Sequence, residues 1–189
     1  NKKGKSRLGL SAGVETTLVL DPEKGTATMK ALNPYVWPIE KWTDLQEAYG
    51  ALRTGNLSPK VLGLGKSDKP FTWVSVDGTT KMSNMALRYV MAQAEEKDLD
   101  RKPGMVQQRD YGKAGELMKQ MLQNFHTLPI NVYYTAQERV ISVGGFDDDE
   151  DAEDQGVMQV PDLPAGVRSS ILSIVEVIGR LYTIRTEEK

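Results

Sequence analysis

Two polar motifs in this sequence could bind a phosphate group and its metal. Gly4-Lys5-Ser6 opens a short helical pattern, and this triplet is how a phosphate-binding loop ends. In such a loop backbone N–H groups surround the phosphates, the lysine reaches the outer phosphates, and the serine hydroxyl ligates Mg²⁺. Asp77 ends the apolar stretch "FTWVSVD", where an acid can hold the same Mg²⁺ directly or through water. The pairing of the triplet with this acid predicts a nucleotide–magnesium site.

Two more residues follow apolar stretches and could act on the same nucleotide. Glu23 comes directly after "TTLVLDP", and a carboxylate there can position or deprotonate the attacking water. Gln137 ends "NVYYTAQ", and a neutral amide there can sense the γ-phosphate and transmit its loss to the next segment. Simpler explanations exist for each motif, namely a basic N-terminus, strand-ending polar residues and ordinary turn chemistry. The individual residues therefore leave both interpretations open.

The elements around these residues decide whether they can meet. Apolar, β-rich runs at 16–21, 71–77 and 129–137 predict strands, and helical patterns separate them. Nearly apolar strands that alternate with helices indicate an α/β fold, with a parallel sheet covered on both faces. Ligands of such sheets bind at the carboxyl ends of the strands. The segment "NPYVWPIEKW" predicts an extended crossing, and the β-branched run 171–185 predicts at least one more strand.

Composition narrows the class of protein. The 189 residues suit one domain, expected to span 1–189, and the net charge is −2. Seven acids fall within 147–154, so the rest of the chain has 24 basic against 19 acidic residues, a formal +5 that permits binding to polyanions.

The absence of cysteine excludes disulfides and thiolate metal sites, and the lone His126 cannot build a zinc site. No apolar run reaches the length of a membrane span and no secretory signal pattern occurs, so we expect a cytoplasmic protein.

The order of these motifs resembles the core of the RecA-like recombinase ATPases. It is most similar to the short phage-encoded members that assist single-strand annealing recombination. The matching text is "GKSRLGLS", "LVLDPEKGT", "VSVDGTTKM", "DYGKAGELMKQML" and "LPINVYYTAQER", and the likeness covers most of the chain. The resemblance implies a RecA-like P-loop NTPase fold with a mostly parallel central sheet and helices on both faces. We expect the first strand and the first half of the phosphate loop to precede Asn1.

The resemblance also implies a role for each motif residue, with ATP and Mg²⁺ as cofactors. Lys5 would contact the β- and γ-phosphates, while Ser6 and Asp77 would hold the metal. Glu23 would activate water and Gln137 would act as the sensor. The implied nucleotide-binding set comprises Gly4, Lys5, Ser6, Arg7 and Asp77. An arginine from an adjacent subunit would complete the site; Arg168 is the candidate, with Arg180 and Arg185 as alternatives.

In the resembled group two loops face DNA, and here they correspond to 96–111 and 139–160. The first loop carries four basic side chains that could neutralise phosphates: Lys97, Arg101, Lys102 and Arg109. A solvated charged loop would have the same composition. The second loop departs from the pattern, because its seven acids repel a phosphate backbone; we expect an acidic flexible loop over 144–160.

These expectations combine into one function with open alternatives. The first is an ATPase acting on single-stranded DNA in recombination or annealing, in the cytoplasm of a bacterial host. It would form a ring or filament of identical subunits, hydrolyse ATP at subunit interfaces with stimulation by DNA, and meet a single-strand-binding or annealing protein. The second is a non-hydrolysing, nucleotide-dependent adaptor or loader for another replication or recombination protein. A different P-loop enzyme, such as a small-molecule kinase, is the third.

Overall fold

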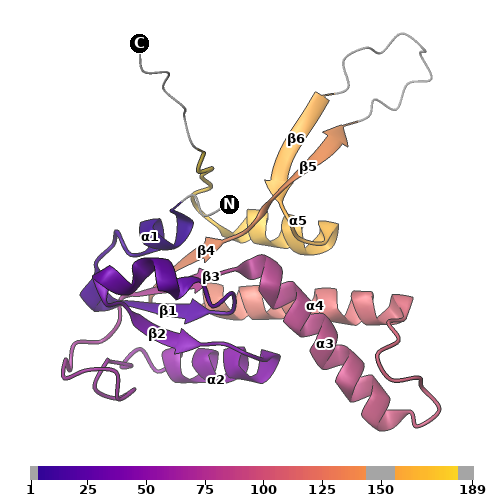
Figure 1. Ribbon diagram of the computed structural model, residues 1–189, viewed down its shortest axis with the longest axis horizontal. Helices are drawn as coiled ribbons and strands as arrows, with labels where there is room; N and C mark the ends of the chain where they lie inside the picture. The colour runs from indigo at the N-terminus through magenta and orange to yellow at the C-terminus, as the bar shows by residue number, and fades with distance from the viewer. Residues whose placement is uncertain (1–3, 144–155, 183–189) are drawn as a thin grey trace.

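Four parallel strands form the centre of the molecule (Figure 1). The computed structural model describes residues 4–143 and 156–182. Across the sheet the order is β2 (Tyr35–Pro38), β1 (Thr17–Asp21), β3 (Trp73–Asp77) and β4 (Asn131–Thr135). All three neighbouring pairs are parallel, so the four carboxyl ends lie along one edge of the sheet. The α/β class is confirmed, and the expected extended crossing supplies β2.

Helices cover both faces of this sheet, as expected. Leu18 and Leu20 of β1 point to the face that carries the main core, whereas Val19 between them points to the other face. The main core contains residues of α2 (Trp42–Leu52), α3 (Thr79–Lys97) and α4 (Gln108–His126). The thinner layer opposite consists of α1 (Lys5–Gly9), the 3₁₀ helix η2 (Gly25–Leu32) and the short turn η1 (Val14–Thr16) that leads into β1. Both sides of the sheet are therefore shielded from water.

The two longest helices, α3 and α4, are amphipathic and pack against each other. In α4 the buried residues are spaced by three and four, so they form one apolar stripe: Ala114, Met118, Met121, Leu122 and Phe125. Asp110 caps this helix by accepting the backbone N–H of Gln107 at 2.7 Å. Within residues 4–143 and 156–182, no helix is both long and apolar enough to cross a bilayer.

The C-terminal part differs from the prediction. The β-branched run 171–185 was expected to form a strand, but α5 (Ala165–Ile174) extends into it, and 175–182 is neither helix nor strand. Val167 and Ile171 lie one helical turn apart and are both buried in the main core, where α5 packs on α4. Burial of this helical pair overrides the β-propensity of the individual residues.

The described parts of the second expected DNA-facing loop, 139–143 and 156–160, form an antiparallel hairpin. β5 (Glu138–Val143) pairs with β6 (Gly156–Pro161), and the hairpin projects away from the central sheet (Figure 1). The expectation of an acidic loop over 144–160 is therefore wrong for 156–160, which belongs to β6. The acids at 147–154 lie outside the described residues.

Candidate functional site

The carboxyl edge of the sheet gathers the predicted metal-binding carboxylate and its neighbours. Asp77 and Thr135 are register partners at the ends of β3 and β4, and each is only 4% exposed. The Thr135 hydroxyl donates to Asp77 Oδ1 at 2.7 Å. This bond fixes Oδ1 of the Asp77 carboxylate and leaves Oδ2 to accept a hydrogen bond from another residue.

The second oxygen of Asp77 meets the predicted phosphate-binding triplet. Ser6 Oγ donates to Asp77 Oδ2, and Lys5 Nζ donates to the carbonyl oxygen of Ala136 at 2.8 Å. Ala136 directly follows β4. The structure thus brings Lys5, Ser6 and Asp77 together at one edge. Gly4 precedes α1 with a φ of 80°, a left-handed conformation that glycine adopts without strain.

The position of α1 depends on a close approach at Gly9. A Cβ at Gly9 would lie 2.5 Å from Ser75 Oγ and 2.9 Å from Cδ1 of Tyr133, so only glycine lets the helix rest on β3 and β4. Burial, and secondly the charge of Asp77, raise the pKa of the Tyr133 phenol. A raised pKa keeps that hydroxyl neutral at physiological pH, so Tyr133 adds no charge beside the site.

Glu23 and Gln137 also meet at this edge. Gln137 Nε2 donates to Glu23 Oε1 at 3.3 Å, although the two residues are far apart in the sequence. Both side chains are exposed, so water has access to the carboxylate. The Gln137 backbone N–H donates to the Thr80 hydroxyl at 3.2 Å, which ties the end of β4 to the start of α3. The predicted water-activating and sensing residues therefore form one contact pair.

Gly78 leaves room for the Glu23 side chain, and this makes a testable prediction. Its φ of 121° disfavours any residue with a Cβ, and a Cβ there would lie 2.5 Å from Cγ of Glu23. We expect Gly78→Ala to displace the Glu23 carboxylate and lower kcat about 10- to 100-fold, with little change in nucleotide affinity. Steady-state ATPase kinetics and calorimetric titration of nucleotide measure the two quantities.

Gly63→Ala is the matched control for this substitution. Gly63 has a φ of 68°, and nothing lies within 4 Å of the Cβ it would gain. The change imposes a left-handed backbone strain of about 1–2 kcal/mol far from Glu23, which is less than the strain at Gly78, whose φ of 121° and ψ of 62° lie outside the left-handed region. Equal losses of kcat in both variants would show that strain, and not the displaced carboxylate, causes the effect.

Asp21 is a site residue that the sequence motifs did not single out. It ends β1, is buried, and its Oδ1 accepts the backbone N–H of Gly25 at 2.9 Å. A Cβ at Gly25 would lie 3.6 Å from Asp77 Oδ2 and 4.0 Å from Asp21 Oδ1, so the Gly25 backbone approaches both carboxylates. The signal in the sequence was the acid at the end of an apolar strand, the same signal that identified Asp77.

Thr79 is a second missed residue, at the first position of α3. Its hydroxyl donates to the carbonyl oxygen of Thr135 at 2.8 Å, and both residues are buried. This bond holds the start of α3 against the end of β4. Thr79 therefore helps to fix the edge on which Asp77 lies.

The donor set fits Mg²⁺ bound together with a nucleotide. Among the described residues, no group of three or more His, Cys, Asp or Glu side chains is arranged to hold a metal by itself. Mg²⁺ is usually held by one or two protein ligands, with substrate phosphates and water completing the shell. The Ser6 hydroxyl and the Asp77 carboxylate, which touch each other, are ligands of that kind.

Arg168 is not brought into this site within the subunit. It lies in α5, where Nη2 donates to the carbonyl oxygen of Leu163 at 3.2 Å. Arg180, one of the alternatives, binds the carboxylate of Glu138 through two nitrogens at 2.9 and 3.1 Å. The third, Arg185, lies outside the described residues. The described contacts thus do not identify the arginine that would complete the site of an adjacent subunit.

The basic residues expected to contact DNA separate into two groups. Lys97, Lys102 and Arg109 are exposed around the turn between α3 and α4. Arg101 is not: its guanidinium pairs with the Asp110 carboxylate, and the two side chains are 0% and 1% exposed. Arg101 Nη2 also donates to the carbonyl oxygen of Met105 at 2.9 Å. A DNA-contacting role for Arg101 is therefore wrong, since its charge is already satisfied inside the protein.

Comparison with known proteins adds a family to this geometry. A family model described as an AAA domain matches residues 1–188. No curated protein and no solved structure matches the chain. The match spans nearly the whole sequence, and the parallel sheet with a lysine, a serine and a carboxylate at its carboxyl edge agrees with it. The chain belongs to the AAA domain family and is a P-loop nucleoside triphosphatase.

Proposed function

We propose that this protein is a Mg²⁺-dependent ATPase of the RecA-like recombination group, acting on single-stranded DNA in recombination or annealing. One observation carries the catalytic part. The Ser6–Asp77 contact and the Glu23–Gln137 contact lie at the same edge of the sheet, on consecutive strand ends. The first contact supplies metal ligands and the second a carboxylate open to water, which are the two requirements of phosphoanhydride hydrolysis.

Each residue then has a distinct task. Lys5 neutralises the outer phosphates, and Ser6 and Asp77 hold the metal. Bound Mg²⁺ supplies charge neutralisation on the phosphate oxygens. The Glu23 carboxylate orients the attacking water and accepts its proton, while Gln137 fixes the carboxylate through its amide at 3.3 Å. Gln137 is also the residue immediately before β5. A movement of Gln137 when the γ-phosphate is lost is therefore transmitted along the chain to the β5–β6 hairpin.

The DNA part of the proposal is supported by the turn between α3 and α4. Lys97, Lys102 and Arg109 project into solvent there and can neutralise a phosphate backbone. We propose a ring or filament of identical subunits in which an arginine, with Arg168 the first candidate, completes the site of its neighbour. A single-strand-binding or annealing protein in the cytoplasm of a bacterial host is the proposed partner.

ATPase activity measured against protein concentration, with and without single-stranded DNA, tests this function. We expect the activity per subunit to rise with concentration and with DNA, because hydrolysis depends on the neighbour's arginine. Glu23→Gln should lower kcat at least about 100-fold while ATP binding stays intact. Activity that is independent of both concentration and DNA would overturn the recombination role. ATP binding with turnover unchanged by Glu23→Gln would instead favour a nucleotide-dependent adaptor or loader.

A further inference from the structure

Glu23 lies in the turn 21–25, which leaves β1 and enters η2, and a buried carboxylate closes this turn. Asp21 is only 3% exposed, and its Oδ1 accepts the backbone N–H of Gly25 at 2.9 Å. The bond joins the first residue of the turn to the last one. The two ends therefore stay together, with Glu23 between them.

The backbone of this turn has little freedom of its own. The ring of Pro22 fixes one of its dihedral angles, and Lys24 has a φ of 55°, in the left-handed region that few residues with a Cβ adopt. Such a conformation persists where the surrounding contacts require it. Lys24 is also paired with Glu40, but that ion pair is exposed and adds little. The buried bond between Gly25 and Asp21 is therefore a stronger constraint on the shape of the turn.

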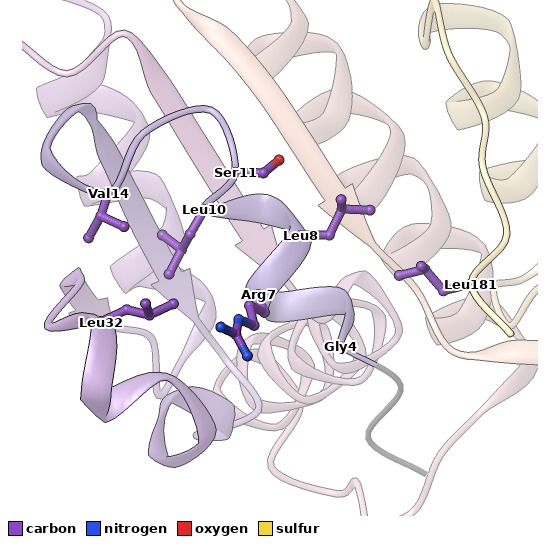
Figure 2. A pocket seen from close by; sticks show the side chains of 8 residues that line it. All are labelled: Gly4, Arg7, Leu8, Leu10, Ser11, Val14, Leu32 and Leu181. Carbon is purple, nitrogen blue, oxygen red and sulfur yellow. The ribbon is translucent and has the colours of Figure 1, made fainter. Parts of the chain in front are cut away.

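Both ends of the turn are attached to rigid parts of the fold. β1 is paired on both sides, by β2 and by β3. In η2, Met29 is 1% exposed and belongs to the apolar cluster on the α1 face of the sheet. Leu32, at the end of η2, lines a pocket with Leu10 and with Arg7 of the predicted nucleotide-binding set (Figure 2). The first residue of η2, Gly25, is therefore a fixed point for the bond that closes the turn.

The closed turn brings the Glu23 carboxylate to two contacts beyond the ends of β3 and β4. Gln137 Nε2 donates to Glu23 Oε1 at 3.3 Å. Cγ of Glu23 occupies the space beside Gly78, where a Cβ would lie 2.5 Å from it. A displacement of about 1 Å in a reacting group can cost about a hundredfold in rate. The bond at Asp21 therefore acts on the reaction through the position of Glu23.

Resting on the proposed function, we propose that Asp21 is a positioning residue for the hydrolysis step. Its carboxylate accepts the Gly25 N–H, closes the turn and so holds Glu23 where the attacking water is oriented. The neighbouring acid has a different task, because Oδ2 of Asp77 accepts a hydrogen bond from Ser6 of the metal site. The acid that ends β1 thus supports the base, and the acid that ends β3 holds the metal.

Asp21→Ala tests this role by the split between turnover and binding. We expect kcat to fall about 10- to 100-fold, while the affinity for a non-hydrolysable ATP analogue and the Mg²⁺ concentration for half-maximal activity stay within about twofold. Asp21→Asn keeps an oxygen that can accept the Gly25 N–H, so it should recover kcat to within about fivefold of the wild type. A metal ligand would behave differently, since both variants would then need far more Mg²⁺.

Thr17→Val is the matched control at the other end of β1. Thr17 is buried, and its hydroxyl donates to the carbonyl oxygen of Gly13 at 2.7 Å. Like the bond at Asp21, this one joins residues four apart, but it lies at the amino edge of the sheet. We expect a lower thermal midpoint, with kcat within about twofold of the wild type. If Asp21→Ala does not fold, Asp21→Leu replaces it, because leucine fills the same space without accepting a hydrogen bond.

The double variant with Glu23→Gln separates positioning from a general loss of stability. Because Asp21 acts through Glu23, we expect Asp21→Ala to change kcat less than about twofold in the Glu23→Gln background. Three results overturn the positioning role: an unchanged kcat in Asp21→Ala, losses that multiply in the double variant, or a raised Mg²⁺ requirement in both Asp21 variants. In each case Glu23→Gln still lowers turnover, so the proposed function stands. Normal turnover in Glu23→Gln itself overturns the proposed function.

Discussion

Asp77→Asn is expected to lower the rate of Mg²⁺-dependent ATP hydrolysis roughly 1000-fold. The change keeps the shape of the side chain, and the Thr135 hydroxyl can still donate to the remaining oxygen, as it does to Asp77 Oδ1 at 2.7 Å. What is lost is the negative charge beside Ser6, and with it a metal ligand. Several kcal/mol of transition-state stabilisation depend on a correctly held metal, and each tenfold in rate corresponds to about 1.4 kcal/mol.

The measurement is kcat as a function of Mg²⁺ concentration. We expect the variant to need far more Mg²⁺ and to bind nucleotide without metal as the wild type does. Asp68→Asn is the control, because Asp68 is an exposed aspartate paired with Lys60 in the loop before β3. A variant that keeps normal activity and normal Mg²⁺ dependence would remove Asp77 from the metal site.

The central part of this site could be predicted because its residues end consecutive strands. Apolar runs identify the strands, and parallel pairing then places every carboxyl end at one edge. Asp77 and Gln137 therefore had to lie near each other once β3 and β4 were correctly recognised. The same rule places Gln137 and Glu23 at one edge, because β1 and β4 both flank β3, and there the two side chains form a hydrogen bond.

A Gly-Lys-Ser triplet by itself does not predict a phosphate-binding site. Gly65-Lys66-Ser67 repeats the residue types of Gly4-Lys5-Ser6. It lies in the loop between α2 and β3, which enters β3 at its amino end, so it is on the opposite edge of the sheet from Asp77. No helix follows it before β3 begins. The element around a motif, and not the motif, determines whether it can meet a metal-binding acid.

The sequence patterns could not predict which individual charged side chains are buried. Arg101 lies in a basic, polar stretch with Lys97, Lys102 and Arg109, and residue type alone does not distinguish it from them. Its partner Asp110 is nine residues away across a turn, and neither helix periodicity nor strand alternation covers that spacing. The strand expected at 171–185 failed for a related reason, since the packing of α5 on α4 is a tertiary contact.

Asp110→Asn is expected to lower the thermal midpoint by roughly 10 °C at neutral pH. Asparagine can still accept the Gln107 N–H that caps α4, so the principal loss is the negative charge opposite the buried Arg101 guanidinium. Removing one member of a buried ion pair leaves an uncompensated charge in the interior. Arg109→Met is the control: it removes an exposed pair with Asp98 at 3.8 Å, and should shift the midpoint by less than about 2 °C.

The pH dependence distinguishes the ion pair from simple packing. The Arg101 hydrogen bond, and next the Gln107 N–H, hold the pKa of Asp110 below its ordinary value of 3.8. A carboxyl with a depressed folded-state pKa contributes stability above its unfolded pKa and loses it as the pH falls through the folded one. The difference in midpoint between wild type and Asp110→Asn should therefore be full at pH 7 and narrow below about pH 4. Calorimetric scans from pH 7 to about pH 2.5 measure it, and a difference that stays constant into acid would mean that the charge of Asp110 does not stabilise the turn presenting Lys97, Lys102 and Arg109.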